Sequence, residues 1–162
     1  MNALRTGHLF AGCGLGMLAD KLNGHAPTWA VEIDEWCCEH LRQRVADGWF
    51  PGCRVVCADA RSVDYASLGA VDALCAGFPC QNISAAGNGT GIDGEKSGLV
   101  WEVFRAIDTL RPAWVFLENS PRIRTKGRDR ILAALMGRRY LVRDGTLAAA
   151  RVGAPHQRNR WW

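Results

Sequence analysis

Short apolar runs alternate with helical patterns along the 162 residues of this chain. The apolar runs read as strands, and they fall at residues 8–11, 28–32, 54–57, 71–75, 113–117 and about 141–147. Helical patterns lie between them, at about 16–22, 34–45, 99–110 and 129–136. Strands that alternate with helices predict βαβ units around a parallel sheet. We therefore expect an α/β fold with a Rossmann-like, doubly wound, mostly parallel sheet.

Three local signals sharpen this expectation. Asp34 is a suitable N-cap for the second helix. The helix at 99–110 has an apolar face at positions 100, 103, 104, 107 and 110. The chain ends on Arg160, Trp161 and Trp162, which read as the start of another strand. An ending of this kind predicts that the fold is C-terminally incomplete or needs a partner.

Composition places the chain among single globular domains. Hydrophobic residues make up 48% and charged residues 22%. No run approaches the roughly 18 apolar residues needed to span a bilayer, and the N-terminus has no signal-peptide pattern. The seven cysteines are an odd number, which favours reduced thiols in the cytoplasm over a disulfide framework. Cys53 and Cys57 have no paired ligand set beside them, so we expect no metal site.

Charge is unevenly distributed. Residues 1–121 hold 9 Lys/Arg and 14 Asp/Glu, a net charge of −5, whereas residues 122–162 hold 11 and 2, a net charge of +9. A basic last quarter is typical of a protein that binds a polyanion such as nucleic acid. The alternative is a solvated helix face that runs from Arg128 to Arg139.

The segment Gly77-Phe78-Pro79-Cys80-Gln81 follows directly on an apolar strand. Its turn would present one cysteine beyond the strand's carboxyl end, where open α/β sheets bind ligands. A glycine-rich stretch follows, from residue 82 to 97. The layout predicts a nucleophile beneath a closing loop. Taken alone, Cys80 also fits a small buried apolar side chain.

A second set of residues predicts a nucleoside cofactor. Glycines follow the first strand in Phe10-Ala11-Gly12-Cys13-Gly14, and they allow close backbone approach at a helix N-terminus. Glu32 ends the second strand, where an acid can accept from ribose hydroxyls. Asp59 ends the third strand and can accept from an adenine amino group. Met17 stands where a dinucleotide fold would have its third glycine, which disfavours a nicotinamide-dependent dehydrogenase.

Polar groups also follow the fifth strand and precede the C-terminus. Glu118 ends the strand next to the cysteine strand, where a carboxyl group can share or donate a proton. Arg158 and Arg160 alternate, so they point to one face of an extended segment and suit a phosphate or a base edge. Alternatively, Glu118 caps a helix or is simply solvated, and the two arginines belong to a charged terminus.

These motifs, in this order, resemble the cytosine-C5 DNA methyltransferases over about residues 9–160. The resemblance implies an S-adenosylmethionine-dependent methyltransferase fold, with residues 1–162 as its catalytic domain. It implies that cofactor is bound by Phe10, Gly12, Gly14, Glu32, Ile33, Asp59, Pro79 and Leu99. Ile33 would take the adenine-stacking place often held by Trp. It assigns Cys80, Glu118, Arg158 and Arg160 to catalysis, and Gln81, Ser84, Arg158 and Arg160 to DNA. Ser120 and His156 depart from the family's usual Val and Gln.

The resemblance also implies a reaction, DNA methylation by covalent catalysis. A cytosine is flipped out of duplex DNA, Cys80 adds to C6, and Glu118 contacts N3 and the amino group. C5 then takes the methyl group of S-adenosylmethionine. Such enzymes belong to restriction–modification or phage self-protection, and we expect the cytoplasm of a bacterial or phage-type host.

No stretch of this chain reads as a target-recognition region, which base-edge readout would need. Two further hypotheses therefore stay open beside the self-sufficient enzyme. In the first hypothesis, the chain is a fragment or one half of a split enzyme, and a partner chain supplies target recognition. In the second, the chain methylates cytosine in RNA.

Overall fold

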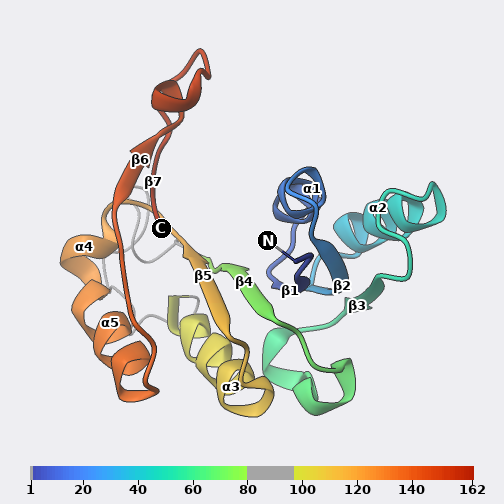
Figure 1. Ribbon diagram of the computed structural model, residues 1–162, viewed down its shortest axis with the longest axis horizontal. Coiled ribbons are helices and arrows are strands. Elements are labelled where there is room, and N and C mark those ends of the chain that lie inside the picture. The colour runs from blue at the N-terminus through green and yellow to red at the C-terminus, as the bar shows by residue number, and fades with distance from the viewer. Residues whose placement is uncertain (1, 80–96) are drawn as a thin grey trace. The chain divides into compact units, whose positions relative to one another are not determined.

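The computed structural model describes residues 2–79 and 97–162 (Figure 1). Helices and strands alternate over the first part of the chain, in the order β1 (Arg5–Leu9), α1 (Leu15–Leu22), β2 (Ala26–Glu32), α2 (Glu35–Ala46), β3 (Arg54–Cys57), β4 (Ala73–Gly77), α3 (Val100–Leu110) and β5 (Trp114–Glu118). The rest comprises α4 (Ile123–Lys126), α5 (Arg128–Gly137), β6 (Thr146–Ala148) and β7 (Asn159–Trp161). Among the described helices, none is long and apolar enough to cross a bilayer.

β1 lies at the centre of a five-stranded sheet with the order β3-β2-β1-β4-β5 (Figure 1). It runs parallel to both β2 and β4, and β2 runs parallel to β3. The chain thus builds outward from β1 to β3 and then returns to the other side of β1. The expected doubly wound, parallel α/β fold is confirmed. In such a sheet, ligands bind at the carboxyl ends of the strands where the order reverses, here between β1 and β4.

The chain forms two compact units. The first comprises Met1–Gly77 and Glu102–Phe116, and the second comprises Phe78–Trp101 and Leu117–Trp162. In the first unit, α1 and α2 pack on the same part of β2, because Met17, Leu41 and Ala30 belong to one buried cluster. Burial of these apolar side chains is the main force that holds the helices on the strand.

Trp29 of β2 explains one sequence choice in the first unit. Its ring is 1% exposed and covers Gly7 of β1, where an added Cβ would lie only 2.2 Å from the ring atom Cζ2. Its Nε1 donates to the carbonyl oxygen of Gly69 at 3.3 Å. Gly7 is therefore needed for close packing rather than for a turn.

The second unit is built around another tryptophan, Trp161, which is 2% exposed. Its backbone exchanges two hydrogen bonds with Asn119, of 3.0 and 2.9 Å, so β7 joins the segment that follows β5. β6 and β7 form an antiparallel pair, Thr146 opposite Trp161. Ile123 of α4 and Ile131 of α5 are fully buried and supply the apolar side of this unit.

The expected elements occur, but several ends differ. The first strand ends at Leu9 rather than residue 11, because Phe10 adopts a left-handed φ of 56° and starts a turn. The strand expected at 141–147 is only Thr146–Ala148, since its partner β7 is equally short. The start of α2 was predicted correctly, because the Asp34 side chain accepts from the Cys37 N–H at 2.9 Å. Helix α4 was missed.

Candidate active site

The loop between β1 and α1 has the backbone that its glycines predict. Gly12 and Gly14 have φ of 52° and 85°, in the left-handed region that other residues avoid. A Cβ on Gly14 would also lie 2.6 Å from a methyl carbon of Leu41. α1 begins immediately after Gly14, so its first N–H groups lie at the end of the loop. A helix start of this kind suits an anionic or polar ligand group.

Glu32, at the end of β2, is held by three backbone N–H groups. Its Oε2 accepts from Gly12 at 2.7 Å, and its Oε1 accepts from Ile33 at 2.9 Å and Asp34 at 3.0 Å. A carboxylate has about four acceptor positions, so one remains on Oε2. The glycine loop and the acid that the sequence predicted to share a cofactor are therefore in direct contact. Glu32 both fixes the loop and keeps the capacity to accept from a ribose hydroxyl.

Ile33 and Asp59 complete the predicted cofactor residues of the first unit. Ile33 is 64% exposed beside Glu32, an open aliphatic surface on which a flat ring can stack. Asp59 forms an ion pair with Arg61 of 2.6 Å and accepts from the Arg61 N–H at 2.9 Å. The Arg61 side chain lowers the pKa of Asp59. Asp59 is thus ionised but shared with an arginine that the sequence interpretation did not consider.

In the second unit, Glu118 and Arg160 form an ion pair, with Arg160 Nε 2.5 Å from Glu118 Oε1. The two side chains come from β5 and β7 and are 29% and 27% exposed. The sequence predicted both as catalytic but did not predict their contact. The pair is close enough to solvent to meet a substrate and sheltered enough to hold a fixed geometry.

Asn119 explains how this pair is positioned. Its side chain is 1% exposed, and its Nδ2 donates to the carbonyl oxygen of Phe78 at 3.0 Å. Its Oδ1 accepts from the Ser120 N–H at 2.7 Å. Together with the backbone pairing to Trp161, these bonds link the segment that precedes Cys80 to the residues that flank Glu118 and Arg160. Asn119 is therefore a positioning residue of the second unit.

The sequence interpretation missed a partly buried acid, Asp144, which binds the indole of Trp161. Trp161 Nε1 donates to Asp144 Oδ2 at 2.8 Å, and Arg128 binds both oxygens of Asp144 at 2.7 Å each. The Arg128 guanidinium and the indole N–H lower the pKa of Asp144 to about 2. The sequence signal was an arginine at the start of α5 and an acid after its end, a pattern too common to predict a contact.

The remaining predicted residues fall into two groups. Pro79 and Leu99 are half-buried, and Arg158 is exposed at the start of β7. Cys80, Gln81 and Ser84 lie outside the described residues, as do the loop glycines 87, 89 and 91. Their roles stay predictions from the sequence.

The described residues combine an open parallel α/β sheet with a glycine loop and a strand-end acid, an arrangement typical of folds that bind nucleosides. The family model of C-5 cytosine-specific DNA methylase matches residues 4–162. The chain belongs to this family.

Relatives and solved structures agree with the family match. The chain is 32% identical over 160 residues to the type II methyltransferase M2.BsuMI of Bacillus subtilis, covering 94% of this chain and 39% of the relative. It is also 32% identical to M.CviJI of Paramecium bursaria Chlorella virus IL3A, over 99% of this chain and 42% of the relative. The structure of the S. pombe Dnmt2 methyltransferase matches with a TM-score of 0.77 at 18% identity, over 98% of this chain and 49% of that one. The chain therefore spans about two fifths of the length of these curated relatives.

Proposed function

We propose that this chain carries the catalytic site of an enzyme that methylates C5 of cytosine in DNA through a covalent bond to Cys80. The observation that carries the proposal is the Glu118–Arg160 ion pair, fixed by Asn119 to the segment that leads into Pro79 and Cys80. The family match gives the reaction class, a DNA cytosine methylase that uses S-adenosylmethionine.

The first unit would bind the cofactor. Gly12 and Gly14 let the backbone approach the cofactor, Glu32 accepts from its ribose hydroxyls, and Ile33 stacks on its adenine. Asp59 would accept from the adenine amino group while it stays paired with Arg61. When bound, S-adenosylmethionine supplies the electrophilic methyl group. These groups bind and orient, and none of them needs to change its covalent state.

The second unit would act on the base. A cytosine inside a duplex hides C6, so the base must be flipped out. The Cys80 thiolate then bonds to C6 and makes C5 nucleophilic. Glu118 Oε1 contacts Arg160, which leaves Oε2 to accept from the cytosine 4-amino group. After methyl transfer the C5 proton is removed, and the bond between C6 and the Cys80 sulfur breaks to restore the ring. Arg158 and Arg160 would hold the base and the neighbouring phosphates.

A second candidate function rests on the length of the relatives. Because the chain spans 39–42% of M2.BsuMI and M.CviJI, target recognition in a working enzyme would come from further protein. In this case the chain is one half of a two-part methylase, and it would bind cofactor but methylate only with its partner.

A covalent-trapping experiment tests the proposal. When S-adenosylmethionine is present, a 5-fluorocytosine in duplex DNA accepts the methyl group but has no C5 proton to lose. The adduct with Cys80 should therefore persist and shift the chain on a denaturing gel. Cys80→Ser should give no adduct, whereas the control Cys57→Ser should behave as the parent chain. Adduct with Cys80→Ser would contradict the mechanism. An adduct with RNA that contains 5-fluorocytosine, and none with the DNA, would show that the substrate is RNA rather than DNA.

A further inference from the structure

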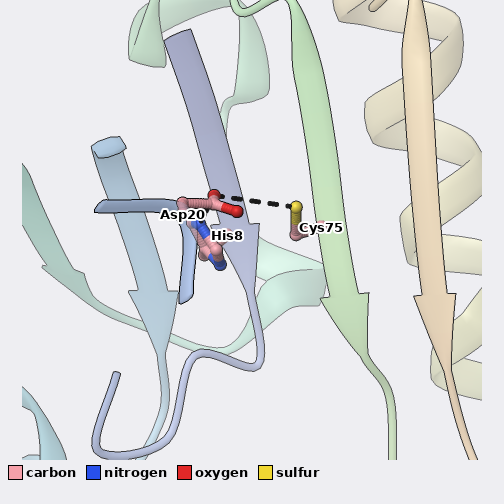
Figure 2. A group of neighbouring side chains, drawn as sticks. All are labelled: His8, Asp20 and Cys75. Carbon is pink, nitrogen blue, oxygen red and sulfur yellow. Dashed lines mark hydrogen bonds and ion pairs between the residues drawn. The ribbon is translucent and has the colours of Figure 1, made fainter. Parts of the chain in front are cut away.

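Three side chains of the first unit, none of them among the predicted catalytic residues, come together. His8 lies on β1, Asp20 on α1 and Cys75 on β4 (Figure 2). His8 and Cys75 are register partners on adjacent parallel strands, so their side chains project from the same face of the sheet. Figure 2 shows the Asp20 carboxylate beside the His8 ring and pointing toward the Cys75 sulfur.

The three groups are close and largely sheltered from water. One nitrogen, one oxygen and one sulfur all lie within 4.8 Å of one another. His8 Nε2 is 2.8 Å from Asp20 Oδ2, and Cys75 Sγ is 4.0 Å from the same oxygen. The side chains of His8 and Asp20 are only 5% and 18% exposed. Imidazole, carboxylate and thiolate are the three protein ligands that zinc prefers.

We propose that His8, Asp20 and Cys75 form a binding site for a zinc ion, with three protein ligands and one water molecule. The site is separate from the methylation chemistry, and its presence does not depend on the proposed function. On binding, a zinc–sulfur bond forms while the Cys75 S–H proton leaves to solvent, so the ion replaces that proton.

The distances suit a tetrahedral ion after small movements. Zinc bond lengths near 2.0–2.3 Å give ligand separations of roughly 3.4–3.6 Å. The His8–Asp20 separation of 2.8 Å must therefore widen, and the Cys75–Asp20 separation of 4.0 Å must shorten, each by about half an ångström. Side-chain rotation of Asp20 adjusts both of these separations. The third separation, between His8 and Cys75, is at most 4.8 Å and must shorten to roughly 3.5 Å through rotation of those two side chains.

The His8 imidazole also has polar partners when no metal is bound. Thr6 Oγ1 lies 3.3 Å from His8 Nε2, so the imidazole has two polar neighbours without an ion. A metal ion would exchange these bonds for a crosslink between α1, β1 and β4. Since β1 and β4 lead into the glycine loop and the Pro79 segment, the ion would stiffen the support of both.

Cobalt is a suitable probe, because Co²⁺ takes zinc's geometry and its bond to a thiolate absorbs in the near ultraviolet. We expect the parent chain to bind one Co²⁺ with a sulfur charge-transfer band, which Zn²⁺ then bleaches. Cys75→Ser should lose the band, and Asp20→Asn should weaken binding roughly ten-fold or more. The control Cys13→Ser changes an exposed thiol that lies 3.6 Å from Cys37, a second place where a metal could bind.

The same titration overturns the proposal if the parent chain shows no band. It is also overturned if the band survives Cys75→Ser or disappears with Cys13→Ser or Cys80→Ser. If Cys75→Ser does not fold, as judged by circular dichroism, then His8→Gln takes its place. Zn²⁺ should raise the unfolding temperature of the parent chain and leave that of His8→Gln unchanged. Equal rises in both would contradict the site.

Discussion

Glu32 in the first unit and the paired acids of the second unit are held in different ways. Glu32 accepts from three backbone N–H groups, although Asp59 and Asp72 of the same unit pair with Arg61 and Arg5. In the second unit, Glu118 and Asp144 are bound by guanidinium groups from other elements, Arg160 and Arg128. The backbone donors of Glu32 are set by the turns that follow β1 and β2, whereas Arg160 and Arg128 reach their acids only when distant elements pack.

This difference has consequences for robustness. A backbone-held carboxylate keeps its place as long as its own loop folds, and a single side-chain change elsewhere affects it little. A side-chain-held carboxylate depends on each partner and on what orients the partner. We therefore expect substitutions in the second unit to have the larger effects on stability, and those in the first to act mainly on cofactor affinity.

The largest effect is expected from Asn119→Ala in the second unit. The substitution removes the Asn119 amide, which donates to the Phe78 carbonyl oxygen and accepts from the Ser120 N–H. The carbonyl of Phe78, a residue that is only 2% exposed, then loses this hydrogen-bond partner. We expect a loss of about 3 kcal/mol in the free energy of unfolding, measured by urea denaturation. Asn159→Ala changes an exposed asparagine of the same unit and should cost less than about 0.5 kcal/mol. Equal losses would show that Asn119 does not position the site.

Glu32→Gln tests the first unit. The glutamine oxygen can accept from some of the three N–H groups, but its NH₂ group faces the rest as a second donor. We expect the dissociation constant for S-adenosylmethionine, measured by calorimetry, to rise roughly 10- to 100-fold.

Asp34→Asn is the matched control, because it makes the same chemical change two residues away and asparagine caps a helix equally well. The affinity of Asp34→Asn for S-adenosylmethionine should stay within about three-fold of that of the parent chain. If both variants bind alike, the loop does not depend on the Glu32 carboxylate.

A smaller effect on stability is expected from Asp144→Asn in the second unit. The pKa of Asp144 is lowered to about 2 by Arg128, so its ion pair stabilises the fold above the ordinary value of 3.8 and is lost as pH falls towards 2. The variant should be about 1 kcal/mol less stable than the parent at pH 7, and the difference should vanish near pH 2. Unfolding midpoints across this range measure it.

Asp72→Asn in the first unit makes the same substitution in another acid that is paired with an arginine, so its loss of stability can be compared with that of Asp144→Asn. Arg5 likewise lowers the pKa of Asp72 to about 2, but the Asp72 side chain is 36% exposed against 15% for Asp144. Solvent screens the more exposed pair, so its loss should be the smaller one over the same pH range. A larger loss for Asp72→Asn would reverse the comparison between the units.

The sequence predicted what depends on local pattern. The parallel sheet, the Asp34 cap and the loop from Gly12 to Gly14 all follow from spacing of at most a few residues, and the structure confirms them. The contact between that loop and Glu32 follows from parallel strands, whose carboxyl ends share one edge. These are features for which neighbouring residues decide the conformation.

Features that join distant elements could not be predicted. The Glu118–Arg160 pair required β7 to pair beside β5. The Arg61 partner of Asp59 is only two residues away, but it lies in a short turn that has no sequence pattern. The zinc site that we propose also depends on strand order. His8 and Cys75 are register partners on β1 and β4 although they lie 67 positions apart, and no ligand-spacing rule detects such a pair.

The most direct test of the central claim is transfer of tritiated methyl groups from S-adenosylmethionine to mixed-sequence duplex DNA. The 162-residue chain is assayed beside Cys80→Ser, with and without a second chain that carries the further part of a relative. The account predicts incorporation by the parent chain, alone or with that partner, and none by Cys80→Ser. Incorporation by Cys80→Ser equal to the parent, or cofactor binding with no transfer under either condition, would contradict it.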